Sequence, residues 1–427
     1  MQKKLEISFI DRIYLFYVLL FAARATVFTS NMDYRINPFG FLLLVVPCLY
    51  LVREHRITFI DKRLVRIYVL LFLWMFIHYF VDETFKLLPY VILFINVSIG
   101  YVLIKVFRED IYELVECYIT ILTAVCLVLW VAMHVVGIKI FESLGVMEPT
   151  SNTSVASLLI FNVPNMAFYE NQGIAGLMRN CGFAWEPGLF ASIICIAIYF
   201  NLISKKTLIG NWRFYILVLG LLSTFSTTGY SALMLILVNH FIFQNKGKIL
   251  RYIYLFLFLP LFLTIMSLSF MSEKMKTAGD SSWADNKAGM ISLEMSNTYM
   301  TVQRGEGLYL DYLNFMDKPV LGYGTENNSY VANYLSDHLL TSNGVMKDFA
   351  RFGIILALFI NIIFMQNARY IDQLYNQRYC MFYFLIVVIS ISYPFSTLPL
   401  MIALCFNYMW SNTKTDIDKN KKIPIWK

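Results

Sequence analysis

The feature that most constrains this chain is a succession of apolar stretches, each about long enough to cross the hydrocarbon core of a membrane. In the first part of the chain they lie near residues 13–30, 36–52, 64–81, 87–107 and 114–137. Later ones lie near 187–204, within 213–244 as two short spans, and near 251–271, 345–366, 379–395 and 397–411. A total of about twelve spans predicts an all-α polytopic integral membrane protein, with residues 1–427 as one transmembrane domain.

Composition agrees with this fold class and excludes several functions. Hydrophobic residues make up 58% of the chain and charged residues 15%, which does not suit a water-facing surface. The seven cysteines are dispersed without a Cys-x-x-Cys pair, and Cys181 alone falls in a segment expected outside the membrane. No Walker loop or His-Glu-x-x-His motif occurs, so the sequence predicts no metal site and no cofactor.

The distribution of Lys and Arg predicts on which side of the membrane each connecting segment lies. Segments 52–66 and 204–213 are rich in Lys and Arg, and short loops of this kind stay in the cytoplasm. This topology explains most of the net charge of +7, so the charge does not indicate nucleic acid. Both termini are then cytoplasmic, and the long segments 138–186 and 272–344 are two extracytoplasmic loops. The assignment requires a turn between two spans at residues 226–229.

A first candidate site lies where a polar loop becomes an apolar span, at residues 179–191. Pro187 suits the first turn of a helix, so a helix is expected to begin there with Glu186 at its mouth. Unpaired N–H groups and the macrodipole favour anions at that position, and Arg179 lies a short loop segment away. Two interpretations stay open: Arg179 and Glu186 act on a substrate, or they form a salt bridge that pins the loop to the bundle.

A second candidate site lies in the later outer loop. Arg304 precedes apolar and aromatic positions at 308–315, which predict an amphipathic helix on the membrane or over the bundle. Gly322 and Gly324 then permit a turn with unusual backbone angles. This loop can bring Arg304 and His338 over the bundle, and a surface helix followed by a solvated loop is the alternative.

Arg24 is a further candidate, because it lies well inside the first apolar run. An unpaired cation is costly at that depth, so Arg24 is expected to face a polar cavity. A direct role with a carrier phosphate and snorkelling of the side chain to the outer interface are both compatible with its position.

Three patches of the sequence resemble a known family. Residues 179–191 resemble the Arg-x-x-Gly-x-x-x-Glu-Pro-x-x-x-Ala pattern of Wzy-type O-antigen and exopolysaccharide repeat-unit polymerases. The run 223–231 is similar to the Ser/Thr-rich turn before Gly in that family. The second outer loop, from Arg304 through 318–324 to 352–354, is similar as well. By topology the resemblance covers most of the chain, and by motif it covers these patches.

The resemblance implies a metal-independent glycosyltransferase in the bacterial cytoplasmic membrane. It would move a growing glycan from an undecaprenyl-pyrophosphate carrier to a sugar hydroxyl of an incoming lipid-linked repeat unit, at the outer face. Arg179 and Arg304 would contact the pyrophosphate, because a guanidinium offers forked donors that match phosphate oxygens. Glu186 is the candidate base for the acceptor hydroxyl. The implied partners are the lipid bilayer, the two lipid-linked glycans, a flippase and a chain-length regulator.

Two alternatives to a polymerase follow from the same features. O-antigen ligases share this architecture and carry a His-Asn pair shortly before the Gly of a following helix. In this chain Ser342 and Asn343 occupy the positions where a ligase has the His-Asn pair, and the nearest histidine, His338, lies four residues upstream. The absence of a histidine at the pair favours a polymerase over a ligase. His338, Ser342, Asn343 and Arg24 are kept as candidate substrate-binding residues. A lipid-linked-oligosaccharide flippase is the other alternative, although the two halves of the chain show no repeat.

Overall fold

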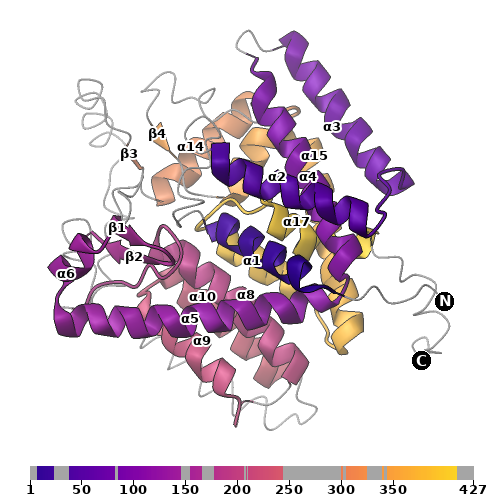
Figure 1. Cartoon of the computed structure of the whole chain (residues 1–427). Helices are drawn as coiled ribbons and strands as arrows, with labels where there is room; N and C mark the ends of the chain where they lie inside the picture. The colour runs from indigo at the N-terminus through magenta and orange to yellow at the C-terminus, as the bar shows by residue number, and fades with distance from the viewer. Residues whose placement is uncertain are drawn as a thin grey trace.

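The computed structural model describes residues 7–23, 38–81, 85–145, 154–165, 177–205, 208, 210–243, 300–301, 304–324, 339–340 and 344–410. Helices dominate this part of the chain (Figure 1). The expected span near 251–271 lies outside the described residues, as do large parts of both predicted outer loops.

The helices of the first half match the predicted apolar stretches closely. They are α1 (Phe9–Ala23), α2 (Pro38–Glu54), α3 (Lys62–Val81), α4 (Leu87–Phe107), α5 (Asp110–Val136) and the short α6 (Ile138–Ser143). The hairpin of β1 (Ser154–Leu158) and β2 (Phe161–Pro164) follows, antiparallel, with Leu158 opposite Phe161. The described part of the chain is otherwise mostly helical, which agrees with the expectation of an all-α membrane protein. The hairpin pairs backbone groups within the connection between α6 and α8.

The second half begins with the helix predicted at Pro187. Its elements are α8 (Pro187–Lys205), α9 (Trp212–Ser223), α10 (Thr227–Val238), the π-helical turn η1 (Asn239–Phe243), β3 (Met300–Thr301), α14 (Arg304–Asp317), β4 (Leu339–Leu340), α15 (Gly344–Tyr375), α16 (Met381–Ser390), α17 (Pro399–Cys405) and α18 (Asn407–Trp410). A turn divides this stretch, but it lies at residues 224–226 and not at 226–229 as predicted, because α9 ends at Ser223 and α10 already begins at Thr227, with Ser226 as its N-cap. The last expected span, 397–411, consists of two short helices.

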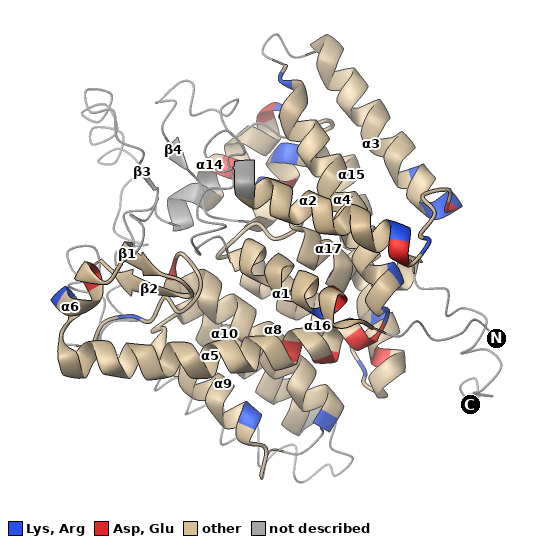
Figure 2. Ribbon diagram, in the orientation of Figure 1, with Lys and Arg blue, Asp and Glu red and all other residues tan. Residues whose placement is uncertain are grey.

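The chain is a helical protein with membrane-spanning character. Within the described ranges, five helices are long and apolar enough to cross a membrane, and they are α3, α4, α5, α8 and α15. Helices α9 and α16 are apolar but shorter. Figure 2 shows Asp, Glu, Lys and Arg mostly near helix ends, with long uncharged stretches between them. This distribution is the one expected of helices whose middles lie in hydrocarbon.

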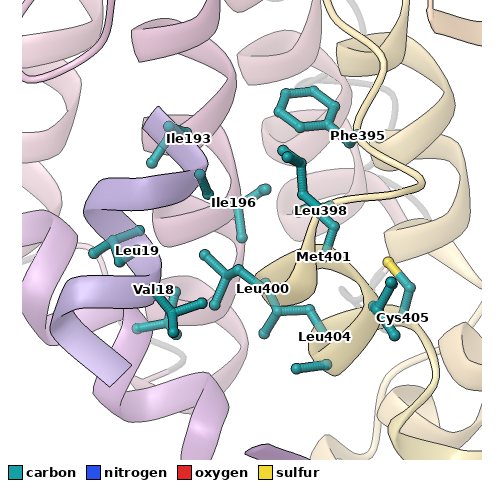
Figure 3. Packing of buried hydrophobic residues seen from close by; sticks show 14 of the residues in the cluster. Val18, Leu19, Ile193, Ile196, Phe395, Leu398, Leu400, Met401, Leu404 and Cys405 are labelled. Carbon is teal, nitrogen blue, oxygen red and sulfur yellow. The ribbon is translucent and has the colours of Figure 1, made fainter. Parts of the chain in front are cut away.

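Helix α8 forms the centre of the bundle. Every residue from Pro187 to Ile203 is buried, and α5, α9 and α10 pack directly on it. A helix that is apolar on all sides is stable only where apolar neighbours surround it. Figure 3 shows side chains of three helices meeting in this core, including Val18 and Leu19 of α1, Ile193 and Ile196 of α8, and Leu400 and Leu404 of α17. The motif that begins at residue 179 therefore leads into the most enclosed helix.

One end of the bundle, here called the basic end, collects the Lys- and Arg-rich connections. Polar contacts join helix ends there, namely His55 Nε2 with Asp11 Oδ1 at 3.1 Å, Lys105 Nζ with Asp61 Oδ2 at 3.1 Å, Arg213 Nη1 with Glu116 Oε2 at 2.9 Å, and Tyr370 Oη donating to Glu109 Oε1 at 2.5 Å. Burial alone would raise the pKa of Asp61. The N–H of Arg63 and the ammonium of Lys105 more than offset that effect, so the pKa lies below its ordinary value.

Candidate functional site

The opposite end of the bundle, here called the loop end, contains the first predicted site. Arg179 is 7% exposed, and its Nε donates to the carbonyl oxygen of Thr224 at 3.0 Å. The neighbouring Asn180 donates from its backbone N to the carbonyl of Ser223 and from Nδ2 to Ser223 Oγ, each at 2.9 Å. The loop before α8 is thus attached to the turn between α9 and α10. Two segments singled out in the sequence, 179–191 and 223–231, are therefore in direct contact.

The backbone of this loop is fixed from two sides. Asn180 Oδ1 accepts the N–H of Gly182 at 2.8 Å, which closes a tight turn. Gly182 has a φ of 55°, and a Cβ there would overlap the ring of Phe190. From the hairpin, Asn162 donates its N–H to Gly182 O at 2.9 Å and its Nδ2 to Ala184 O at 3.1 Å. Cys181, which belongs to the segment expected outside the membrane, is fully buried in this loop.

Glu186 lies where the sequence predicts it, at the mouth of α8. Pro187 is the first helical residue, and the carbonyl of Glu186 accepts the N–H of Phe190 at 3.1 Å. Glu186 is half-buried. The N-terminal N–H groups of α8 favour negative charge at this point.

A third connection completes the loop end. Residues 391–398, between α16 and α17, place the Tyr393 ring 6.1 Å from that of Trp185. In the same connection, Ser396 Oγ donates to Asp348 Oδ1 at 2.7 Å, near the start of α15. The N–H of Trp185 donates to Ala23 O at 3.4 Å, so α1 ends here as well. The starts of α8 and α15 are therefore linked through one short segment.

Helix α15 is broken near this end, and a second segment is inserted at the break. Gly353 has φ 66° and ψ 175°, which interrupts the helix. Residues 318–324, here called the clip, pair with the exposed backbone: Tyr323 N donates to Ala350 O at 2.8 Å, and Ile354 N donates to Pro319 O at 2.8 Å. A Cβ at Gly353 would overlap the carbonyl oxygen of Val320. The patches 318–324 and 352–354, both noted in the sequence, thus form one unit.

Helix α3 holds the clip from its other side. Trp74 Nε1 donates to the carbonyl oxygen of Leu321 at 3.0 Å, and His78 Nε2 lies 3.2 Å from the same oxygen. The Trp74 ring also packs on Phe352 with centroids 5.4 Å apart. His78 is 1% exposed. The clip therefore connects α3 to the break of α15, and because it directly follows α14, it also fixes the end of that helix.

Helix α14 lies in the segment where the sequence predicts an amphipathic helix on the membrane or over the bundle. Leu310, Asp311 and Asn314 are buried, whereas the apolar side chains of Leu308 and Tyr312 are exposed. α14 packs on α15, where Lys347 is also buried. The contact between the two helices includes aromatic packing, because the Phe315 ring of α14 lies 5.7 Å from the Phe349 ring of α15.

The remaining predicted residues are not placed by the structure. Arg304 is the first residue of α14, and its side chain lies outside the described part of the chain. Arg24, His338, Ser342 and Asn343 also lie outside the described residues. Among the residues that are described, no group of three His, Cys, Asp or Glu side chains could hold a metal ion.

Sequence reasoning missed a charged group at the start of α15. Lys347 and Arg351 are close enough to Asp348 to interact with its carboxylate, and Asp348 accepts the hydroxyl of Ser396. The signal was present in the sequence, because three charges stand inside the first turns of the span expected at 345–366. Their spacing places them on one side of a helix.

Comparison with known proteins adds no relative to this description. No family model matches the chain, and neither the curated proteins nor the solved structures contain a match. The contacts between 179–186 and the α9–α10 turn, and between the clip and α15, are properties of this chain itself. A family assignment for the protein therefore depends on its own motifs and on how they meet in the fold.

Proposed function

We propose that this protein is a Wzy-type polymerase that joins undecaprenyl-pyrophosphate-linked repeat units. The observation that carries the proposal is the meeting of motif segments at the loop end. Arg179 and Asn180 contact the Ser/Thr-rich turn after α9, and the clip pairs with the backbone around Gly353. The connection 391–398 reaches from Trp185, just before α8, to Asp348 on α15, and so links the two contacts. This arrangement supports the proposal of one site at the loop end.

The proposal includes a topology of about twelve spans in the bacterial cytoplasmic membrane, with both termini in the cytoplasm. The basic end then faces the cytoplasm and the loop end faces outward. The grouping of Arg213, Lys105 and His55 with their carboxylate partners at one end supports this orientation. Segments 138–186 and 272–344 form the two outer loops that cover the loop end.

The proposed reaction is glycosyl transfer with an activated leaving group. The acceptor hydroxyl attacks the anomeric carbon of the donor sugar, the bond from that carbon to the pyrophosphate oxygen breaks, and the hydroxyl proton passes to a base. Glu186 is the proposed base, since it is a half-buried carboxylate at the mouth of α8. The departing pyrophosphate gains negative charge, which Arg179 and Arg304 would stabilise. Arg179 is positioned by the hydrogen bond from its Nε to the carbonyl oxygen of Thr224.

Reconstitution with purified lipid-linked repeat units tests the proposal. Wild-type protein should convert single repeats into a ladder of longer glycans without an added metal. Glu186→Gln should keep its abundance and lose most turnover, because the amide retains the size of the side chain but is not basic. Glu142→Gln is the matched control, since Glu142 is an exposed carboxylate on α6 near the same end, and it should polymerise normally.

Deletion of the gene supplies a second readout in cells. Loss of a polymerase leaves exported repeats unjoined, so the cell surface should carry glycan of one repeat where a ligase is present. Loss of a flippase traps the repeats on the cytoplasmic leaflet. Repeats confined to that leaflet, or a purified protein that leaves single repeats unjoined, would contradict the proposed function.

A further inference from the structure

Residues 53–66, here called the basic turn, contain the connection between α2 and α3 at the basic end. Helix α2 closes with Arg56 at a φ of 49° and with the N–H of Ile57 donating to Val52 O at 2.9 Å. Asp61 starts α3, because its Oδ1 accepts a backbone N–H from the first turn of that helix at 2.9 Å. The path of the basic turn is therefore set by hydrogen bonds at both of its ends.

Helix α4 holds the middle of the basic turn. Tyr101 Oη donates to the carbonyl oxygen of Thr58 at 2.9 Å, and the Tyr101 ring lies 5.8 Å from the ring of Phe59. One helical turn further along α4, Lys105 Nζ contacts Asp61 Oδ2 at 3.1 Å. The backbone of the turn is thus fixed to the bundle before any partner arrives, which lowers the entropy that binding would cost.

The charges around this turn are divided between the inside and the outside of the bundle. Asp11 and Asp61 are paired with His55 and Lys105. The exposed charges of the turn are mostly positive, because a single exposed acid, Glu54, stands against four exposed cations, namely Arg53, Arg56, Lys62 and Arg66. Figure 2 shows these basic positions gathered where α2 ends and α3 begins. Ile60 is 84% exposed, so the turn projects from the bundle.

The position of the basic turn along α3 places its cations at the edge of the membrane. Val65 and Val69 are exposed apolar side chains on a helix long enough to span the hydrocarbon core, so they face lipid. Lys62 and Arg66 lie within one helical turn of Val65. Cations directly beside a lipid-facing stretch are at the level of the lipid headgroups.

We propose that the basic turn is a binding surface for anionic phospholipids of the cytoplasmic leaflet. Guanidinium and ammonium groups bind phosphate oxygens through charge-assisted hydrogen bonds. Each Lys or Arg near an anionic membrane surface strengthens association by roughly fivefold, so four on one short segment discriminate between an anionic lipid and a zwitterionic one. The inference requires a membrane and the orientation of the basic end, and it does not depend on glycosyl transfer.

Binding of phosphatidylglycerol to the full-length protein in detergent, with phosphatidylcholine as the reference lipid, is measured by native mass spectrometry. The test variant carries Arg53→Gln, Arg56→Gln, Lys62→Gln and Arg66→Gln. The control variant loses the same charge at exposed positions elsewhere on the basic end, through Arg12→Gln, Lys205→Gln, Arg369→Gln and Arg378→Gln. The test variant should bind phosphatidylglycerol about tenfold or more weakly than wild type, and the control variant should bind it nearly as wild type. Phosphatidylcholine should bind all three proteins equally.

A variant that gains binding keeps the result decisive if the test variant folds poorly. Glu54→Lys converts the exposed acid of the turn to a cation and should strengthen phosphatidylglycerol binding severalfold, which a folding defect would not produce. Glu113→Lys makes the same change at an exposed position of α5 and should have little effect. Circular dichroism must show wild-type helicity for every variant that is compared.

Two results would overturn the proposal. One is equal phosphatidylglycerol binding by the test and control variants, which would assign the lipid to the overall charge of the basic end. The other is equal binding by Glu54→Lys and Glu113→Lys. Because the lipids in this experiment carry no glycan, failure of the polymerisation assay would remove the proposed function and leave the lipid surface in place.

Discussion

At the scale of single residues, Arg179 shows how far sequence reasoning reaches. The sequence leaves two roles open, contact with a substrate and attachment of a loop. The structure gives Arg179 an attachment through Thr224. That partner could not be read from the sequence, because it lies 45 residues away and offers a backbone carbonyl, which every residue has. By contrast, Pro187 as the first residue of α8 was predictable, since proline suits that position locally.

The two roles of Arg179 predict different outcomes for its variants. Arg179→Lys keeps a positive charge but cannot present two parallel donors to a phosphate, so activity should fall about tenfold or more at near-normal abundance. Asn180→Ala is the control for attachment, because it removes the contacts to Ser223 and Gly182 from the same loop. Its abundance should fall, with the remaining protein active. Polymer yield per molecule that is equal in all three proteins would assign Arg179 to the loop attachment alone.

At the scale of elements, the helices were more predictable than their interruptions. Apolar length sufficed to anticipate α3, α4 and α5. The break in α15 was hidden, because its cause is the clip, which lies earlier in the chain and pairs with backbone that the helix leaves open. The burial of Asp311 and Asn314 on α14 was not predictable either, because periodicity reports where apolar residues lie and not which polar residues a neighbouring helix covers.

Glycine variants test the clip. Gly353→Ala should destabilise the protein by roughly 1–3 kcal/mol, because the new methyl group overlaps the carbonyl of Val320 at a position that also needs a positive φ. Gly137→Ala is the matched control, with φ at 106° and open space around it, and it should lose only about 1 kcal/mol from backbone strain. Thermal unfolding in detergent measures both. Equal losses would mean that the clip does not restrain α15.

At the scale of the whole molecule, the argument for a membrane protein depends on where the charged residues lie along the helices. Charged contacts group at the basic end, while α5 contains no Asp, Glu, Lys or Arg after Glu116. The sequence predicts which helix ends lie on the same side from Lys and Arg alone, because basic residues in short loops determine the orientation of membrane helices. The arrangement of the bundle around α8 was not predictable, because nearly every apolar stretch has the composition to be central.

Single-cysteine variants test the orientation. Leu159→Cys and Val320→Cys introduce thiols at exposed positions of the loop end, and Ile60→Cys introduces one at the basic end. An impermeant thiol reagent should label the first two in intact spheroplasts and the third only after permeabilisation. Native Cys181 is buried and should add no background. Labelling of Ile60→Cys in intact cells would reverse the topology and remove the outer location of the site.

The burial of α8 has a consequence for the order in which the protein is made. Its neighbours α1 and α5 precede it in the chain, whereas α9, α10 and α16 follow. Because lipid tails are as apolar as leucine, α8 can enter the bilayer before its later neighbours exist and rest against lipid in the meantime. The later helices then exchange lipid contacts for protein contacts. The helix that ends as the most enclosed part of the bundle is thus exposed to lipid during synthesis, and the loop end is completed only by the last helices to arrive.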